Sequence, residues 1–403
     1  MSDIAITGVG ITTPIGQGKA TVQSGLLNAT THFGVMQRPG RQRTGSAFLG
    51  AEIGTLQLPV CVPDRMRRTL SWSAQVALAT VAEAWSDADL AAVDPQRIGI
   101  IVGGSNLQQR ELTAVQDTYR DRVEYLRPSY GQAFMDTDIS ALCSEVFGVR
   151  GIAYTAGGAS ASGHLAIVQA VQAVQTDQLD ACIAVGALMD LSCFECQGLR
   201  ALGAMGSDLF ADDPAAACRP FDKQHDGFIY GENCGAVVIE RAERVRGRPY
   251  ALVRGWSYQV DGHRGPNPSL DGEIRAISAA VKMSGIPIED FDYVNPHGTG
   301  SGLGDEVELR ALRGCGLSGA RINATKAILG HGLSAAGAVE VIATLLQMQA
   351  GALHPTPNLH DPIDPTFLWV QNEACTHRIR NALNASFGFG GINSAICLSN
   401  YSH

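Results

Sequence analysis

Short apolar segments alternate with segments of helical periodicity along almost the whole chain. Buried strands are expected at residues 97–102 and 180–185, where apolar and β-branched residues run between turns. Between them, residues 164–175 are rich in alanine and valine and contain no lysine, arginine or acidic residue, which indicates a helix buried on all sides. Because parallel strands need a helical crossover, this order predicts an α/β fold with mostly parallel sheets.

The second half of the chain repeats this order of elements. Helices are expected at residues 273–283, 305–312 and 334–349, and strands at 293–295 and 395–398. Residues 235–240 and 250–258 are expected to form a pair of strands between the two series, and the strand that starts at residue 4 is expected to be broken by Gly8, Val9 and Gly10. No linker rich in proline and serine separates the series, so we expect two intertwined halves, residues 1–240 and 241–403, in one globular unit.

Composition and charge exclude several classes of protein. The 403 residues are 45% hydrophobic and only 17% charged, which permits a large core and excludes intrinsic disorder. The net charge is −9 and the chain has no run of five lysines and arginines, so neither nucleic acid nor an anionic membrane surface is expected as a partner. The amino terminus lacks a basic segment followed by an apolar one, and no 18-residue segment is both apolar and uncharged. We therefore expect a cytoplasmic protein that does not span a membrane.

Ten cysteines are scattered along the chain, most of them in apolar segments, which is typical of reduced, buried thiols. Cys193 and Cys196 have the spacing of half a zinc site, but no second pair lies at a suitable distance, so we expect two core thiols. The glycine-rich string at residues 298–304 lacks the setting of a dinucleotide-binding motif. We expect neither a bound metal nor a nicotinamide cofactor.

Two histidines stand in segments framed by glycine, His297 in NPHGTGSGLGD (residues 295–305) and His331 in ATKAILGHG (residues 324–332). A third segment of this kind is NASFGFGGIN (residues 384–393). Turns of this sort, placed before a helix, present side chains to a ligand. Two neutral imidazoles that donate hydrogen bonds to one carbonyl oxygen stabilise an enolate. The alternative interpretation is that each histidine only forms hydrogen bonds within its own turn and has no catalytic role.

Ser160 lies in TAGGASASG (residues 155–163), immediately before the uncharged helix. A helix start has free N–H groups and the positive end of the helix dipole, which favour an anion or an oxyanion. Ser160 is therefore either a nucleophile or an N-cap, and serine is a favoured N-cap residue.

Together these segments resemble the β-ketoacyl synthases, the thiolase-fold condensing enzymes of fatty-acid and polyketide assembly. The resemblance covers nearly the whole chain and rests on blocks that occur in one order: ITGVGITTPIG (6–16), RPFDKQHDGFIYGENCGAVVIE (219–240), NPHGTG (295–300), TKAILGHGLSAAGA (325–338), HPTPNL (354–359) and NASFGFGGIN (384–393). It implies a thiolase-like, duplicated five-layered αβαβα fold with mixed, mostly parallel sheets.

The resemblance also implies roles for individual residues. His297 and His331 match the two catalytic histidines of the family, and Lys326 matches its catalytic lysine. Glu308 is similar to the acidic residue that pairs with that lysine. Such pairing would make Lys326 an organiser of His331 rather than a proton donor.

Ser160 occupies the position of the family's reactive cysteine. Its backbone N–H is expected to form an oxyanion hole with that of Phe389, and Phe387 is expected to support the site. A thiol at a helix start ionises at neutral pH, whereas a hydroxyl needs a base held against it. Loss of carbon dioxide from a malonyl group needs only the donors that stabilise the enolate.

We therefore expect a ketosynthase-like decarboxylase that converts malonyl-acyl carrier protein to acetyl-acyl carrier protein in β-branching systems of polyketide biosynthesis. One alternative is a β-ketoacyl synthase or an acyltransferase with Ser160 as its nucleophile. A second is a non-catalytic partner of an active synthase, like a chain-length factor. The resemblance implies no cofactor beyond the phosphopantetheine arm of the carrier protein, and a homodimer, with a heterodimer as the alternative.

Two surfaces refine this expectation. Asn106, Gln108 and Gln109 lie where related synthases often place small or apolar residues around the acyl chain, which favours a short or absent acyl chain. Alternatively, these side chains point to solvent or into a dimer contact. Arg65, Arg67 and Arg68 form the densest basic cluster and are expected to dock the acidic acyl carrier protein, unless they are merely solvated.

Overall fold

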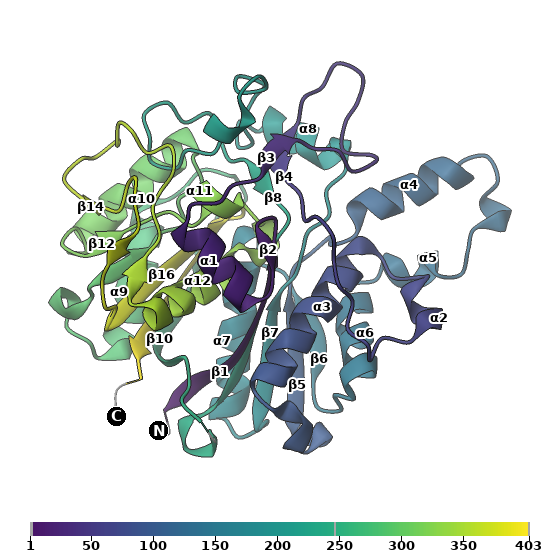
Figure 1. Cartoon of the computed structure of the whole chain (residues 1–403), viewed down its shortest axis with the longest axis horizontal. Helices are drawn as coiled ribbons and strands as arrows, with labels where there is room; N and C mark the ends of the chain where they lie inside the picture. Colours follow the sequence, from purple (N-terminus) through teal and green to yellow (C-terminus); the bar gives the residue numbers. More distant parts are fainter. Residues whose placement is uncertain (1–2, 246, 402–403) are drawn as a thin grey trace.

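One twelve-stranded mixed sheet runs through both halves of the chain (Figure 1). The protein is described by a computed structural model over residues 3–245 and 247–401. The strand order is β14-β12-β11-β16-β17-β10-β1-β9-β7-β5-β6, with β2 paired to β1. Two small sheets, β3-β4-β8 and β13-β15, lie outside it. The strands are β1 (Ile4–Thr13), β2 (Gly16–Gln17), β3 (Phe33–Val35), β4 (Leu49–Ala51), β5 (Ile98–Gly103), β6 (Ala153–Ala156), β7 (Ala181–Gly186), β8 (Tyr230–Gly231), β9 (Cys234–Arg241), β10 (Ala251–Val260), β11 (Tyr293–Asn295), β12 (Arg321–Ile322), β13 (Ala352–Leu353), β14 (Leu368–Trp369), β15 (Cys375–Thr376), β16 (Asn381–Gly388) and β17 (Ile392–Asn400).

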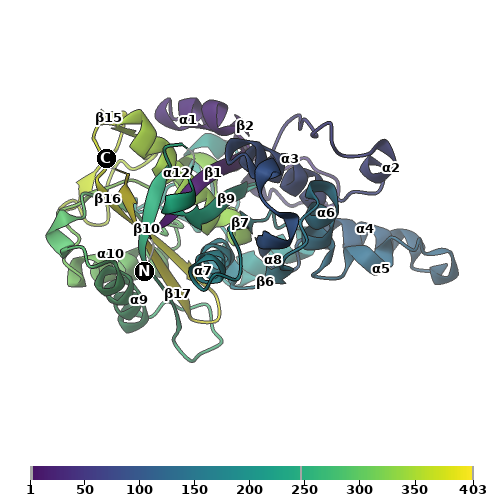
Figure 2. The same cartoon turned by 90° about the horizontal axis from the view of Figure 1, so that it is seen from below.

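The helices form three layers around the two halves of this sheet. Helices α3 and α6 pack on the strands of the first half, α9 and α10 cover the second half, and α7 and α12 pack against each other between them (Figures 1 and 2). This arrangement is the five-layered α/β fold that the resemblance implies. The large sheet is mixed, as expected, but it is not mostly parallel, because the strands from β7 to β16 in its middle pair antiparallel and the parallel pairs lie toward its two ends. The helices are α1 (Lys19–Leu27), α2 (Asp64–Arg67), α3 (Trp72–Asp87), α4 (Gln109–Tyr119), α5 (Tyr130–Ala133), α6 (Asp138–Phe147), α7 (Ser162–Gln175), α8 (Cys193–Ala201), α9 (Leu270–Ser284), α10 (Gly302–Gly314), α11 (Lys326–Leu329) and α12 (Ala336–Ala350).

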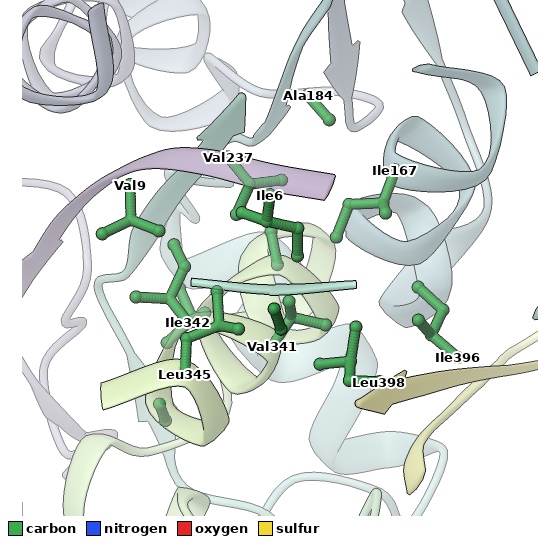
Figure 3. Packing of buried hydrophobic residues seen from close by; sticks show 14 of the residues in the cluster. Ile6, Val9, Ile167, Ala184, Val237, Val341, Ile342, Leu345, Ile396 and Leu398 are labelled. Carbon is green, nitrogen blue, oxygen red and sulfur yellow. The ribbon is translucent and has the colours of Figure 1, made fainter. Parts of the chain in front are cut away.

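The two central helices are apolar because both are enclosed. Ile167 of α7 and Ile342 of α12 belong to the largest buried cluster, together with Ile6 of β1 (Figure 3). The segment Leu333–Ala350 is long and apolar enough to span a bilayer, but 89% of it is buried inside the protein. Its apolar character is therefore explained by its place in the core.

Strand β1 joins the two halves of the sheet, and the expectation that glycines break it is wrong. It pairs antiparallel with β9 on one side and with β10 on the other, with only a register shift between Ile6 and Gly8. The glycines are needed for close packing against α3. A Cβ atom on Gly10 would lie 2.0 Å from the carbonyl oxygen of Thr80, and one on Gly8 would lie 2.7 Å from that of Ala84. Strands 235–240 and 250–258 thus flank β1 and do not pair with each other.

We predict that Gly10→Ala destabilises the fold by about 3 kcal/mol, because the added methyl group forces β1 away from α3. Urea unfolding followed by circular dichroism measures the change in the free energy of unfolding. Gly34→Ala is the matched control, since no heavy atom lies within 4 Å of a Cβ atom at that glycine. Equal stability of the two variants would contradict this account of the β1–α3 contact.

Candidate active site

Ser160 lies in a short 3-10 turn, Ala159–Ala161, between β6 and the central helix α7. Ala159 has a left-handed backbone with φ of 47°, a conformation that is costly for a residue with a side chain. The N-cap interpretation of Ser160 is wrong, because the local backbone is held by Ser162 instead. The Ser162 hydroxyl accepts a hydrogen bond from the Gly158 N–H (2.9 Å) and donates one to the Ala159 carbonyl (2.7 Å). The Ser160 side chain is thereby free to face His331.

His331 is locked in one tautomer by its own turn. Its backbone N–H donates to the Ile229 carbonyl at 2.7 Å, which fixes the loop after α11. Its ring Nδ1 accepts a hydrogen bond from the backbone N–H of Leu333 at 3.2 Å, so the proton of the neutral ring is on Nε2. Nε2 lies 3.1 Å from the hydroxyl oxygen of Ser160. His331 is therefore a hydrogen-bond donor toward Ser160 and not a base for it.

His297 directs a second N–H into the same space. The ammonium group of Lys326 lies 3.4 Å from Nδ1 of His297 and also donates to the His297 backbone carbonyl. A cation against Nδ1 requires that atom to be unprotonated, so Nε2 carries the proton. The rings of His297 and His331 lie 5.4 Å apart at an interplanar angle of 83°. Two neutral imidazoles thus bring their N–H groups to one site.

Lys326 pairs with Glu340 of the central helix α12, which corrects the expected pairing with Glu308. Both side chains of the observed pair are only 3% exposed. Glu308, on α10, instead accepts hydrogen bonds from the backbone N–H groups of His297 (2.6 Å) and Gly298 (2.8 Å). It shapes the histidine turn, and the direct contacts of Lys326 are with His297 rather than with His331.

Burial and Lys326 keep both histidines neutral. The pKa of His297 and that of His331 lie well below the usual value, chiefly because burial disfavours the imidazolium and also because the ammonium of Lys326 repels it. Burial raises the pKa of Glu308 to about 8 against the effect of its two backbone donors. Burial also raises the pKa of Glu340, and the ammonium of Lys326 opposes this effect. The histidines are consequently donors at neutral pH, as an enolate oxygen requires.

The end of β16 lies against Ser160. A Cβ atom on Gly388 would lie 3.2 Å from the backbone nitrogen of Ser160, and the Phe387 ring lies 5.8 Å from that of His297. Phe389 is 37% exposed and lines the cavity beside the serine. Its expected role, with the N–H of Ser160, in an oxyanion hole remains a prediction that this proximity permits.

A cavity of about 300 Å³ contains this constellation. It brings together Ser160, His297, His331, Phe387 and Phe389, whereas Lys326 lies behind the histidines and is not part of its wall. Several further residues that line the cavity were not predicted as site residues: Phe228, Asp261, Glu273, Thr299, Ser301 and Asn393. Thr299 and Ser301 could have been found, because they follow His297 in the same glycine-rich segment.

A second, small cavity of about 40 Å³ lies behind the loop after β5 and shares no lining residue with the first. Ser105 lines the main cavity, while Asn106, Gln108 and Gln109 line the small one. Gln108 is buried, and its amide donates to Asp138 at 2.9 Å. This position contradicts a side chain that points to solvent and agrees with a buried polar residue in the loop after β5. The amide of Gln109 donates to Asn106 at 3.2 Å in an exposed contact.

The basic cluster lies on and just after the short helix α2, and none of its residues lines either cavity. Arg67 is engaged locally, since its guanidinium donates to the carbonyl groups of Val62 and Pro59 at 3.0 Å. Arg65 and Arg68 are exposed. Two of the three arginines are therefore available to a partner.

The cysteines are free thiols, and most of them are buried. Cys193 and Cys196 lie at the start of α8 and are 8% and 0% exposed, which confirms that they are core thiols. Burial raises the pKa of Cys196 to about 12. Cys61 departs from the expectation because it is exposed.

Family comparisons agree with the geometry. The model of the β-ketoacyl synthase N-terminal domain matches residues 1–244, and that of the C-terminal domain matches residues 250–360. The chain is 54% identical over 403 residues to the polyketide biosynthesis malonyl-ACP decarboxylase PksF of Bacillus subtilis (strain 168), covering 99% of this chain and 97% of that protein. It is 30% identical to 3-oxoacyl-[acyl-carrier-protein] synthase 1 of Buchnera aphidicola subsp. Acyrthosiphon pisum, with full coverage of both chains.

Solved structures share the fold over the full length. A β-ketoacyl synthase from Burkholderia phymatum superposes with a TM-score of 0.90 at 24% identity, covering 100% of both chains. The ishigamide ketosynthase/chain length factor superposes with a TM-score of 0.89 at 24% identity, again with 100% coverage. The expected thiolase-like fold is confirmed, and the chain belongs to the β-ketoacyl synthase family.

Proposed function

We propose that this protein removes carbon dioxide from the malonyl thioester of an acyl carrier protein and releases acetyl-acyl carrier protein. The observation that carries the proposal is the hydrogen bond between Ser160 and a His331 ring whose Nδ1 is occupied by a backbone N–H. A serine that faces a donor has no base to ionise it. Acylation, the step that needs a nucleophile at residue 160, is therefore lost, while His297 and His331 remain as hydrogen-bond donors to the enolate.

The geometry supports a simple sequence of events. The thioester carbonyl oxygen accepts hydrogen bonds from the Nε2–H groups of His297 and His331. The bond between Cα and the carboxylate breaks, carbon dioxide leaves, and its electron pair becomes the enolate that the two donors stabilise. A proton then adds to Cα, so that malonyl thioester and one proton give acetyl thioester and carbon dioxide.

The walls of the cavity favour loss of the carboxylate. The lining residues include no lysine or arginine, whereas Asp261, Glu273, Asp305 and Glu308 are carboxyl residues. Phe228 lies against His331, with ring centroids 5.0 Å apart. A malonyl carboxylate in this cavity meets no countercharge, and its conversion to neutral carbon dioxide removes that cost.

The space for a growing acyl chain is also restricted. Leu107 is 8% exposed and belongs to the core cluster that contains side chains of β5, and the buried Gln108 lines the small cavity and not the main one. Both residues follow Ser105, which lines the main cavity, so we infer that they leave no room for a long alkyl chain beyond it. This supports a substrate without a bound acyl chain over the alternative of a condensing synthase.

The relatives support the same assignment. PksF, which is 54% identical over nearly the whole chain, is named a malonyl-ACP decarboxylase of polyketide biosynthesis. Retention of His297, Lys326 and His331 in one buried constellation disfavours a purely structural partner, because such a subunit has no chemical use for them.

We predict that His297→Ala or His331→Ala lowers kcat by about 10²-fold or more, because each removes one enolate donor. Ser160→Ala keeps its backbone N–H and is expected to lose less than about tenfold. The measurement is the mass of the carrier-bound group after incubation with malonyl-acyl carrier protein. A stoichiometrically acylated Ser160 together with an extended β-ketoacyl product would overturn the proposal in favour of a condensing enzyme.

We further propose that Arg65 and Arg68 form part of the surface that docks the carrier protein, since both are exposed while Arg67 holds its own loop. Replacing both with alanine is expected to raise KM for malonyl-acyl carrier protein about fivefold and to weaken its salt dependence, with kcat unchanged. The control is the double variant Lys282→Ala/Arg321→Ala, which removes equal charge from exposed positions elsewhere. Identical KM values for the two double variants would exclude this docking site.

We also propose a homodimer formed through β6, the strand at one edge of the large sheet. The N–H of Ile100 donates to the carbonyl of Ile152, and the N–H of Gly104 donates to the carbonyl of Ala156. Within residues 152–156, the even-numbered residues therefore direct their backbone groups to β5. In a parallel pair, the backbone N–H and C=O groups of Ala153 and Thr155 then point to the open edge of the sheet. Exposed apolar side chains lie on β6 and on the α4–α5 arm that projects beside it (Figure 2): Val123, Tyr125, Phe134, Met135 and Tyr154.

We predict that Ala153→Pro converts a dimer into a monomer, because proline removes an edge N–H without breaking the β5–β6 ladder. Light scattering after size-exclusion chromatography measures the mass. Ala153→Val retains the N–H and is expected to remain dimeric. A wild-type protein that runs as a monomer, or a dimeric Ala153→Pro variant, would exclude this interface.

A further inference from the structure

Glu273 is a buried carboxyl residue that lines the cavity of the active site and has no role in the steps described so far. It lies in the first turn of α9, is 1% exposed, and borders the cavity. Its Oε2 atom is buried and has no hydrogen-bond partner among the described residues. An acidic side chain in such a place requires an explanation, because an isolated charge is costly to bury.

The neighbouring carboxyl groups differ from Glu273 in having donors. Asp261 accepts a hydrogen bond from the Asn393 amide at 2.9 Å and lies 3.4 Å from the guanidinium of Arg275. Glu308 accepts two backbone hydrogen bonds from the histidine turn. The two backbone donors partly offset the cost of ionising Glu308, whereas no hydrogen-bond donor contacts the Oε2 atom of Glu273 among the described residues.

Burial and the repulsion of Glu308 and Asp261 raise the pKa of Glu273 well above its usual value. Burial raises the pKa of Glu308 as well, but both oxygens of Glu308 are held by the histidine turn. Glu273 is thus the protonated acid of the cluster that has an oxygen without a partner among the described residues, and its side chain borders the cavity.

We propose that Glu273 supplies the proton that converts the enolate to the acetyl group. This inference rests on the proposed decarboxylation and names the group that completes it. In a condensing enzyme the enolate carbon attacks an acyl group, but here no electrophile is held at Ser160, so an acid must take its place. The two histidines are engaged with the enolate oxygen, and Lys326 is bound to Glu340 and His297.

The proton balance is complete within the cavity. The enolate carbon takes the proton of the Glu273 carboxyl group through cavity water, which forms the third C–H bond of the acetyl group. Glu273 is left as a carboxylate beside Glu308 and Asp261, where it is least stable, and it regains a proton from solvent through the cavity mouth. Each turnover consumes one proton and needs no oxidant, reductant or cofactor.

The charged and titratable groups around Glu273 set the expected pH dependence. They are Glu308 on α10, Asp261 and His263 after β10, and Arg275 on α9 itself, while β17 contributes the neutral Asn393. The active form of Glu273 is protonated, so kcat is expected to fall on the alkaline side as this proton is lost.

The test compares Glu273→Gln, Glu273→Asp and Asp271→Asn for formation of acetyl-acyl carrier protein across a pH series. Glutamine has the same shape but carries no acidic proton, so kcat is expected to fall about 10²-fold with KM unchanged and with the alkaline fall abolished. Aspartate keeps an acid and is expected to lose less activity and to retain the alkaline fall. Asp271, which lies two residues earlier and is 80% exposed, is the control and should behave as wild type.

The outcomes separate this inference from the proposed function. If the wild-type protein does not remove the carboxyl group, the proposed function fails, and this inference fails with it. If the wild type is active and Glu273→Gln matches it in rate and pH profile, only the role of Glu273 is excluded. Equal losses for the glutamine and aspartate variants with an unchanged alkaline limb would mean that Glu273 is merely structural. A glutamine variant that fails to fold leaves the aspartate variant to decide, because loss of its alkaline limb would also exclude the acid.

Discussion

A single buried ammonium group orders the chemistry of this site. Lys326 contacts the carboxylate of Glu340, the backbone carbonyl of His297 and the Nδ1 atom of the same histidine. These contacts fix the tautomer of His297 and tie the histidine turn to α11 and to the central helix α12. The positive charge also keeps both imidazoles neutral. Without it, the carboxylate of Glu340 would be buried without a countercharge, so the site and the core would both be disturbed.

The replacement of a thiol by a hydroxyl changes the chemistry without changing this framework. The position of Ser160 depends on the strained Ala159 and on Ser162, neither of which distinguishes a thiol from a hydroxyl. The histidine that faces Ser160 is a donor because its other ring nitrogen is occupied by the backbone of Leu333. A stable arrangement of backbone hydrogen bonds thus determines which half of the family's reaction the site can perform.

Much of the fold could be predicted from the sequence, because buried parallel strands and enclosed helices leave long apolar runs such as those of β5, β7 and α7. The predictions that are wrong or incomplete concern residues whose important contacts are with segments distant in the sequence. Gly8 and Gly10 look like strand breakers, although they only allow α3 to approach β1. Glu340 is hidden in an apolar helix, so the sequence points instead to Glu308, near the first histidine motif, as the partner of Lys326. Glu273 resembles an ordinary polar residue near a helix start, and only the packing of β10, β17 and α10 around it reveals its burial.

The place of β1 in the sheet has a consequence for how the chain acquires its structure. This strand is synthesised well before its two long neighbours, β9 and β10, which are formed by residues 234–241 and 251–260. Apart from the short contact with β2, both edges of this apolar strand therefore stay unpaired until those residues are made, and the contacts that finally close them are very distant in sequence. Such a topology delays the formation of the core and exposes a template for aggregation during synthesis. Productive folding of this protein is thus expected to depend on protection of the nascent amino-terminal strand until residue 260 has emerged.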